Sequence, residues 1–366
     1  MLAGITRYAS GISRVVAFVC AALALAGLAW VVSFATEQVG IRFGHAITGF
    51  MQSTIGNLPE FFVVLFALAA GERTIAETAI LGAILSNALL VLGIVIVVGA
   101  RRAHDGVMRF SPRLPNDTAT LLLLSTFIIV LIGLANAARD PASKHTTTIS
   151  IVGAAAILIV YCAWTVQYLR SAEVPPGRSA DVPPGRSADV PPERSAGVPP
   201  GRSADVPPGE LERPKLAPAA SVALLALAGT ASAFVSDWFV NALEPTIHAL
   251  HITEVFAGLV IVAIAGNAAE SVTGIVMAAK GRSELAISIV KNAVAQIAAF
   301  LYPVLVLVSL LTVTTLTFAL APVYIGALFG TAVIVWQITG DGEATLFEGA
   351  ALIATFVILA TVAAFE

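Results

Sequence analysis

Charged residues are scarce in this chain. Of its 366 residues only 12% are Asp, Glu, Lys or Arg, whereas 58% are hydrophobic. Soluble globular proteins carry about 25% charged residues, so water cannot be the solvent for most of this surface. Lipid has to contact it instead. The net charge of −3 and the lack of a basic patch interleaved with aromatic residues argue against nucleic acid as a partner.

Cysteines and nucleotide-binding motifs are also few or missing. The two cysteines, Cys20 and Cys162, lie within apolar runs and show neither zinc nor disulfide spacing. We interpret both as small packing residues and expect no cofactor. The sequence contains no G-x-x-x-x-G-K-[ST] motif and no soluble domain that could hold a nucleotide, which excludes a primary pump.

Long apolar runs dominate what is present. A membrane-spanning helix needs about 20 apolar residues, and ten segments meet this length. The first is longer than the core of a signal peptide, which has about 7–15 residues. We therefore predict an all-α integral membrane protein with ten transmembrane helices. The predicted spans are residues 15–35, 46–70, 75–99, 118–138, 148–169, 218–240, 254–279, 284–310, 314–337 and 345–365.

A proline-rich linker, residues 170–217, separates the fifth span from the sixth. From Glu173 it repeats sequences such as EVPPGRSA and DVPPGRSA with a period of eight. Paired prolines favour an extended chain, so we expect a semi-stiff disordered linker, with partner binding as the alternative role. Five spans precede it (1–169) and five follow it (218–366). Because five is odd, the second half enters the membrane from the opposite side, which predicts two inverted five-helix repeats.

The distribution of basic residues predicts the orientation. With the N-terminus outside, the segments on the inner side hold 14 Lys and Arg residues, and those on the outer side hold five. Lys and Arg accumulate on the cytoplasmic side of membrane proteins. We therefore expect a multi-pass protein of the cell membrane with both termini outside and the linker in the cytoplasm.

A Gly-Asn-x-x-Glu motif occurs twice, in the middle of the second and seventh predicted spans. The two copies are offset by 210 residues, and Gly71 recurs as Gly281 at the same offset. A carboxylate in the bilayer costs at least a few kcal/mol, so a repeated pair indicates function. The motif residues are Gly56, Asn57 and Glu60 in the first copy and Gly266, Asn267 and Glu270 in the second.

These motifs predict a cation site near the midplane. Asn57 and Glu60 are three residues apart and share one helix face, as do Asn267 and Glu270. If the halves are inverted, two carboxylates and two amide oxygens meet at one point. Such an oxygen-rich site suits a hard cation, Ca²⁺ above all. Pro59 would also free a backbone carbonyl in the first copy; the second copy has no proline, so we expect the two halves to differ there.

Protons suit the same site. Burial disfavours a charged carboxylate, and two neighbouring carboxylates oppose each other's ionisation. The metal-free pair would therefore hold protons and release them when a cation binds. Mutually exclusive occupancy of one site is sufficient for antiport. The structural alternative is a pair of buried acids that only form hydrogen bonds with neighbouring helices.

The third and eighth spans supply further polar groups. Ser86 corresponds to Gln296 at the offset of 210, and Asn292 shares a helix face with Gln296. We expect Ser86, Asn87, Asn292 and Gln296 to assist at the site, with ordinary interhelical hydrogen bonds as the alternative. Lys291 lies about 140° around the helix from Gln296, so we expect its stem to reach the nearby membrane interface; the alternative is a tethered cation that competes with the transported ion.

Two other polar groups have ordinary interpretations. His248, His251 and Glu254 have metal-like spacing, but we interpret them as the solvated end of a loop. Asp341, Glu343 and Glu348 lie in the last inner loop, where they either draw cations towards the pore or are simply exposed.

The motif sequences resemble those of the calcium/cation exchanger superfamily, in its Ca²⁺/H⁺ antiporter branch. The resemblance rests on Gly-Asn-x-x-Glu followed by LGAILSNALLVLG, on its second copy followed by AVAQIAAFLYPVLVL, and on Asp341-Gly342-Glu343. It covers the chain outside the linker, with its two signature repeats around 46–99 and 254–310. It implies a ten-helix core with alternating access, in which Glu60 and Glu270 bind the cation and protons. Asn57, Asn267, Ser86 and Gln296 would assist.

The resemblance also leaves alternatives open. Ala83 and Ala293 stand where the family has serines, Pro59 resembles the sodium/calcium exchanger branch, and the linker is not acidic. Na⁺(K⁺)/H⁺ or Na⁺/Ca²⁺ exchange therefore remains the main alternative to Ca²⁺/H⁺ exchange. A membrane-embedded metal enzyme or a cation channel is a further alternative, but histidines beside the acids are lacking and opposed halves suit alternating access better. We expect the transported cation, protons and lipid as its partners.

Overall fold

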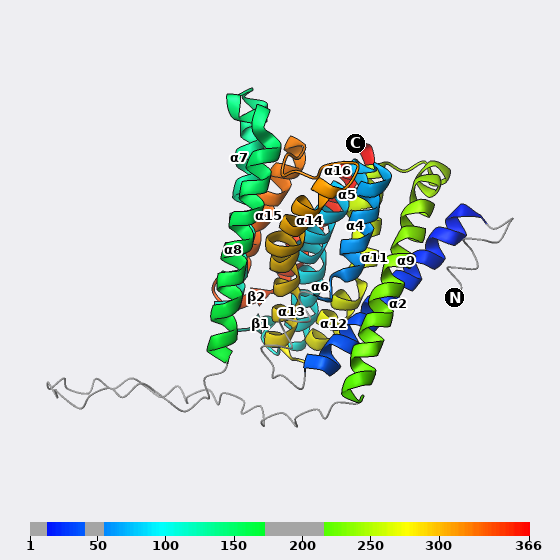
Figure 1. Ribbon diagram of the computed structural model, residues 1–366. Helices are drawn as coiled ribbons and strands as arrows, with labels where there is room; N and C mark the ends of the chain where they lie inside the picture. Colours follow the sequence, from blue (N-terminus) through cyan, green and yellow to red (C-terminus); the bar gives the residue numbers. More distant parts are fainter. Residues whose placement is uncertain (1–12, 41–54, 173–215) are drawn as a thin grey trace, which may run out of the picture.

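The structure, a computed structural model, describes residues 13–40, 55–172 and 216–366 (Figure 1). Within these residues, eight helices are long and apolar enough to cross a membrane, and a bent pair forms a ninth span. The protein is thus an all-helical, multi-pass membrane protein, as predicted. The predicted linker lies outside the described residues.

The elements follow one another along the chain, with short π-helices (η1, η3, η4) and 3₁₀ helices (η2, η5) between the α-helices. In the first half they are α2 (Arg14–Gly40), α4 (Leu58–Ala70), α5 (Arg73–Leu85), η1 (Ser86–Val91), α6 (Leu92–Arg102), β1 (Val107–Arg109), α7 (Arg113–Ala137), η2 (Pro141–His145) and α8 (Thr146–Ala172). In the second half they are α9 (Pro218–Leu250), α10 (Glu254–Phe256), η3 (Ala257–Val262), α11 (Ala263–Gly266), α12 (Ala268–Ala279), α13 (Ser283–Gln296), η4 (Ile297–Leu301), α14 (Tyr302–Val308), η5 (Ser309–Leu311), α15 (Pro322–Thr339), β2 (Glu343–Thr345) and α16 (Leu346–Phe365).

Most predicted spans coincide with these helices. Of the span predicted at 46–70, residues from Ile55 on are described, and α4 forms its second half. The start predicted for the ninth span, at 314, is wrong because α15 begins at Pro322 and residues 312–321 are not helical. Four of these ten residues are threonines, which disfavour helix, and proline suits the first turn of a helix, where no N–H partner is needed.

The backbone repeats itself at the offset of 210 residues. Gly71 after α4 has φ +91° and Gly281 after α12 has φ +76°, and both turns close with the same pair of backbone hydrogen bonds. A positive φ favours glycine, which explains the recurring residue. The π-helices recur as well, since η1 and η4 occupy matching positions after α5 and α13.

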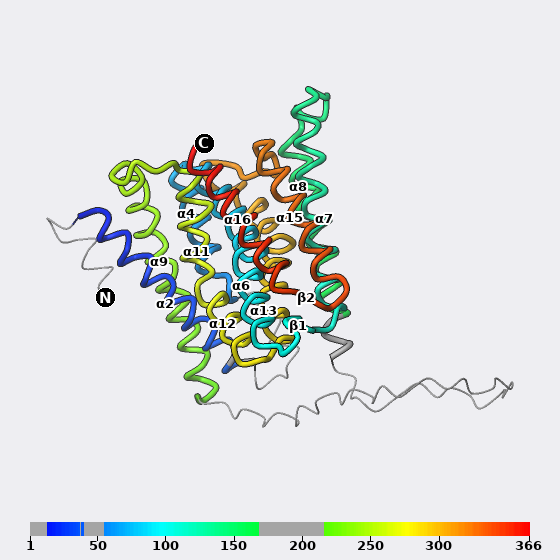
Figure 2. The backbone as a smooth tube through the Cα atoms, turned by 180° about the vertical axis from the view of Figure 1, so that it is seen from behind, coloured from blue at the N-terminus to red at the C-terminus, as the bar shows by residue number. Residues whose placement is uncertain are grey.

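The two helical hairpins lie at opposite ends of the molecule. The α4–α5 turn is at the upper side in Figure 1, where the Thr314 hydroxyl donates to Leu68 O at 2.8 Å. The α12–α13 turn is at the lower side, where the Arg102 side chain lies against Gly281. The view from behind in Figure 2 shows the same arrangement. The two halves are therefore inverted relative to each other, as the odd number of spans predicts.

A small antiparallel sheet at the lower side has no counterpart in the predictions. Strand β1 pairs with β2 in the register Val107↔Thr345, Met108↔Ala344 and Arg109↔Glu343. Arg109 also pairs with Asp105, and this hydrogen bond lowers the pKa of the Asp105 carboxyl. The sheet joins the α6–α7 loop to the α15–α16 loop. Strands this short leave little pattern in a sequence.

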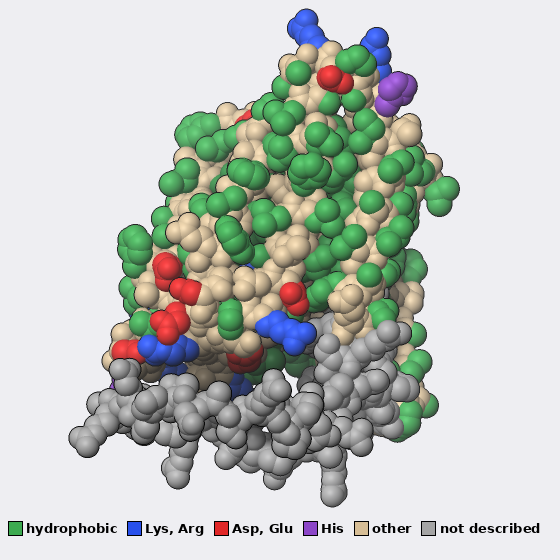
Figure 3. Space-filling view, turned by 90° about the vertical axis from the view of Figure 1, so that its left-hand side faces the viewer, with side chains coloured by type: hydrophobic (Ala, Val, Ile, Leu, Met, Phe, Trp, Pro, Cys, Tyr) green, Lys and Arg blue, Asp and Glu red, His purple; other side chains and the backbone are tan. Residues whose placement is uncertain are grey.

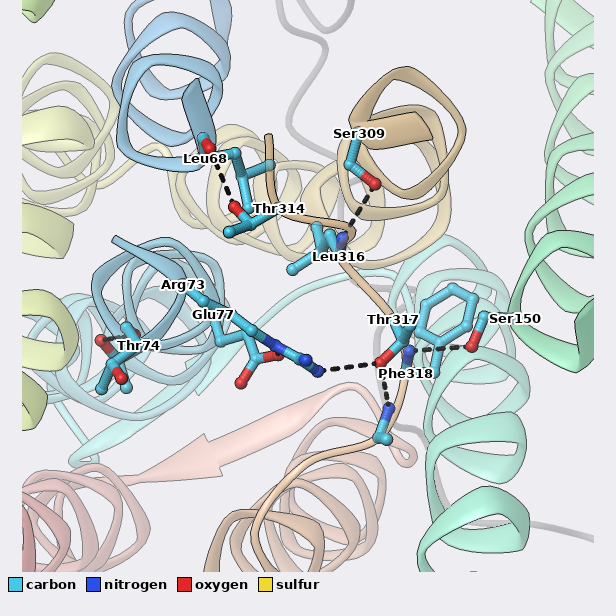
Figure 4. Close-up of polar contacts among 12 residues, drawn as sticks. Leu68, Arg73, Thr74, Glu77, Ser150, Ser309, Thr314, Leu316, Thr317 and Phe318 are labelled. Atoms are coloured by element: carbon cyan, nitrogen blue, oxygen red, sulfur yellow. Dashed lines mark hydrogen bonds and ion pairs between the residues drawn. The ribbon is translucent and has the colours of Figure 1, made fainter. Parts of the chain in front are cut away.

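Residues 312–321, here called the upper strap, hold the other end together (Figure 4). Leu316 and Phe318 are fully buried, so their backbone N–H groups need acceptors. Ser309 Oγ accepts from Leu316 N at 2.9 Å, and Ser150 Oγ accepts from Phe318 N at 3.1 Å. Arg73 Nη2 donates to Thr317 Oγ1 at 3.2 Å, which ties the strap to the start of α5. Serine and threonine side chains thus replace the hydrogen bonds of a regular element.

Candidate functional site

The helices that contain the two motifs break at the same residue. Asn57 has φ −85° and ψ 15°, and Asn267 has φ −89° and ψ 10°. At the second break the chain bends by 61° between Glu254–Gly266 and Ala268–Ala279. The expectation that the halves differ here is wrong, because Pro59 lies in the first turn of α4 rather than within a continuous helix. Each asparagine precedes a new helix.

The two glutamates occupy the first turns of these new helices. Glu60 lies in α4 and Glu270 in α12, three residues after their asparagines. The unpaired N–H groups and the positive dipole end of a helix N-terminus favour a carboxylate there. The sequence therefore places each acid where its own backbone stabilises a negative charge inside the membrane.

The two motifs meet across the repeats. A Cβ atom added to Gly266 would lie 3.1 Å from Glu60 Cγ and 3.2 Å from Glu60 Oε1. Only a residue without a side chain leaves room for this carboxyl group. Glu270 interacts electrostatically with Glu60. Glu60 is buried, whereas Glu270 is partly exposed. Both acids thus belong to one candidate site, built from both halves.

Amide side chains join the two halves beside the acids. Asn87 Nδ2 donates to Asn267 Oδ1 at 2.8 Å and to Ala83 O at 3.0 Å. In the matching position of the other half, Asn57 Nδ2 donates to Gln296 Oε1 at 3.5 Å. Each hinge asparagine is thereby held by a residue at or beside a π-helix of the opposite repeat. π-Helices recur at functional sites because they shift side chains out of the regular helical register.

Several oxygens at this site have no hydrogen-bond donor within the described part of the chain. All are buried acceptors, namely Glu60 Oε2, Glu270 Oε2, Asn87 Oδ1 and Asn292 Oδ1. A buried polar group without a partner costs about 1–3 kcal/mol, and more when it is charged. A cation or a proton would satisfy carboxylate oxygens of this kind. Since Asn267 Oδ1 already accepts from Asn87, Asn87 offers the open amide oxygen of this pair.

A narrow cavity extends from Glu60 between the two halves. Val63, Ile80 and Ala83 line it from the first half, and Ala263 and Leu301 from the second. A volume of about 10 Å³ is open to the centre of a water molecule, which is room for about one water. The cavity therefore suits a bare ion or a proton-carrying water rather than an organic substrate.

The remaining predicted residues contribute differently. Ser86 is buried, and its hydroxyl donates to Ala83 O of its own helix at 3.4 Å. Gly56 lies in the turn before α4. Ala83 and Ala293 are buried beside the network and add no hydroxyl group. The direct contacts between the halves at this level therefore come from amides, not from hydroxyls.

Lys291 does not reach the membrane interface, so that expectation is wrong. Its side chain is 2% exposed, and Nζ donates to Thr339 Oγ1 of α15 at 3.3 Å. Among the described residues no carboxylate lies within ion-pair distance of it. Helix α13 is packed on several sides by α7, α12 and α6, which leave the stem no route outwards. The surrounding helices, not the length of the stem, decide where the amine lies.

Replacing this amine should stabilise the protein. Lys291→Met retains the apolar stem and removes a buried polar group that has one hydrogen bond and no counter-ion. We expect Tm in detergent to rise by several degrees, with the exchange rate retained. A fall in Tm together with a loss of exchange would show instead that the amine takes part in transport.

The other polar groups singled out from the sequence lie away from the site. His248, His251 and Glu254 are exposed around the end of α9, as expected for a solvated loop end. Glu348 caps α16 through Thr345, and Glu343 pairs with Arg109, so these two acids hold local structure. No group of three or more His, Cys, Asp or Glu side chains suited to a metal ion occurs among the described residues.

An acidic rim lies at the upper side beside the α4–α5 turn. Burial raises the pKa of the Glu72 carboxyl, and the charges of Glu244 and Glu254 raise it further. These three residues come from both halves of the chain and are close enough to repel one another. A negative rim of this kind raises the local concentration of cations.

Comparisons with known proteins agree with this architecture. A family model described as sodium/calcium exchanger protein matches residues 13–169 and 220–365. The vacuolar calcium ion transporter of Schizosaccharomyces pombe is 30% identical over 348 residues, covering 93% of this chain and 77% of that protein. The Ca²⁺/H⁺ antiporter of Synechocystis sp. is 28% identical, with 94% and 89% covered.

The fold is similar to that of a solved structure. Native YfkE superimposes with a TM-score of 0.75 at 24% identity, over 100% of this chain and 96% of that chain. The fold, the paired helix breaks and the family match all concern the same two halves. The chain is therefore a member of the sodium/calcium exchanger protein family.

Proposed function

We propose that this protein is a secondary antiporter that exchanges Ca²⁺ for H⁺ at the Glu60–Glu270 site. The observation that supports this best is the set of buried acceptor oxygens without donors, which both halves contribute. Hard carboxylate and amide oxygens suit Ca²⁺, and the same carboxylates can hold protons when it is absent. The relatives named as calcium transporters and Ca²⁺/H⁺ antiporters support the same reaction.

In this proposal the two breaks serve as hinges. A cation that leaves the site exposes both carboxylates, which then take up protons, and protonation in turn opposes cation binding. Access from alternate sides of the membrane, with Asn57 and Asn267 as pivots, would complete the exchange. Glu60 and Glu270 would bind the cargo, Asn87 would add an amide oxygen, and Asn267 and Gln296 would position the other amides.

Exchange of a monovalent cation for protons is the second candidate. It is favoured by Ala83 and Ala293, which are buried at the site and provide no hydroxyl ligands. Ca²⁺ takes six to eight oxygens, so each lost ligand weakens its binding more than that of a monovalent ion.

Proton flux in liposomes distinguishes these candidates. Purified protein is reconstituted with a pH-sensitive dye inside and an imposed pH gradient, and Ca²⁺, Na⁺, K⁺ or Mg²⁺ is added outside in turn. We expect Ca²⁺ to move protons and the monovalent ions to have little effect. A response to Na⁺ or K⁺ without a response to Ca²⁺ would replace Ca²⁺/H⁺ exchange by monovalent cation/proton exchange.

We further propose that the lower side faces the cytoplasm of a cell with this protein in its outer membrane. Six Lys and Arg residues lie on the lower loops and helix ends, namely Arg101, Arg102, Arg109, Arg113, Lys280 and Arg282, against four on the upper ones, namely Arg14, Arg73, Arg139 and Lys144. The excess supports the lower side as the inner one. An impermeant maleimide should label Ala138→Cys in intact cells and His104→Cys only after lysis; the reverse pattern would invert the orientation.

A further inference from the structure

The upper ends of α7 and α8 stand apart from the rest of the molecule. Figures 1 and 2 show both helices extending above their neighbours at the upper side. Apolar side chains nevertheless continue to this level, since Leu131 is 49% and Leu134 is 61% exposed. Apolar surface beyond the level of the other helices lacks cover from the protein itself.

A groove of about 400 Å³ lies between these helix ends. Leu131, Ile132 and Leu134 of α7 line it together with Ile149 of α8. Its lining is almost entirely aliphatic, and its volume is close to that of one long acyl chain. The groove runs along about two turns of α7 towards the turn between the helices.

The rim of the groove is basic. Arg139 and Lys144 are exposed in the α7–α8 turn, and neither forms an ion pair with any described residue. The one acid in the turn, Asp140, is occupied as a helix cap by accepting from Ala142 N at 2.9 Å. Figure 3 shows charged side chains at the tip of this hairpin, separated from the lower charged band by an apolar belt. Basic groups at the end of an apolar groove complement a phosphate headgroup and its acyl chain.

We propose that the α7–α8 groove is a binding site for one anionic phospholipid, with an acyl chain in the groove and its phosphate between Arg139 and Lys144. This lipid would cover the apolar surface that the protein leaves open at the upper side. The site is separate from the Glu60–Glu270 site and does not depend on which cation is transported.

Native mass spectrometry of the delipidated full-length protein in detergent tests this proposal. Phosphatidylglycerol and phosphatidylcholine with identical chains are titrated separately. We expect one phosphatidylglycerol per chain to bind about tenfold more tightly than phosphatidylcholine, because two basic residues face its headgroup. The double substitution Arg139→Gln with Lys144→Gln should remove this preference. The matched pair Arg101→Gln with Arg113→Gln, on the lower side, should retain it.

A second variant tests the groove independently of the rim. Ala135 lines the groove and is partly exposed, so Ala135→Trp fills the space while the basic residues stay. We expect it to lower the occupancy by either lipid. Equal binding of the two lipids, or unchanged binding by the rim variant, would overturn the proposal. So would a dimer that Ala135→Trp separates without changing lipid binding, since a second copy would then cover the groove.

Discussion

Glu60→Gln and Glu270→Gln should each reduce cation-driven proton flux at least about 100-fold while the protein still inserts and folds. Glutamine has nearly the same shape as glutamate but cannot take the negative charge that binds the cation or exchange a proton. Loss of residues that merely support metal ligands typically costs 10–100-fold in affinity, so loss of a ligand should cost more. Liposome flux assays on equal amounts of folded protein measure the effect.

Glu254→Gln is the matched control for this prediction. Glu254 is an exposed glutamate in the first turn of α10, outside the candidate site. We expect it to retain most of the flux, with at most a modest rise in the cation concentration needed for half-maximal exchange. Near-normal exchange in both Glu60→Gln and Glu270→Gln would contradict the assignment of the site.

Gly82→Ala should have the largest effect on folding. Helix α5 packs against η3 so closely that a Cβ atom on Gly82 would lie 2.2 Å from Leu259 O. On the facing side, a Cβ atom on Gly258 would lie 2.0 Å from Thr78 Oγ1. Small residues allow helices in membranes to approach this closely. The contact on Leu259 is with backbone, so the two helices would have to move apart.

We expect Gly82→Ala to lower Tm in detergent by about 5 °C or more, since overpacking costs about 1–3 kcal/mol and sometimes more. Gly27→Ala is the matched control, because no atom lies within 4 Å of its added Cβ. Alanine favours helix over glycine, so this variant should keep or slightly raise Tm. Equal Tm values for the two variants would show that the α5–η3 contact is less tight than described.

Sequence patterns predict most of the fold because the two halves repeat. The offset of 210 residues between the motifs, with Gly71 and Gly281, predicts two equivalent hairpins, and the structure confirms their turns. The repeat of the glutamates also predicts one shared site, which remains a prediction until the substitutions above are measured. Symmetry makes each half a check on the other.

Other features depend on contacts that a linear pattern does not contain. The upper strap is held by hydroxyl groups from η5 and α8, and β1 pairs with a strand more than 200 residues later. The position of Lys291 follows from the helices around α13 rather than from its own helix. The hydrogen bond between Asn87 and Asn267 similarly requires both halves to be folded.

Proton release on cation binding tests the central claim most directly. Ca²⁺ is added to the purified protein in weakly buffered detergent solution, without a membrane or a gradient, and the pH change is recorded over a range of starting pH values. We predict that Ca²⁺ binding releases protons, that its affinity falls as the pH falls, and that the variant with both Glu60→Gln and Glu270→Gln shows neither effect. Binding of Ca²⁺ that is independent of pH and releases no protons would contradict a shared site for cation and proton.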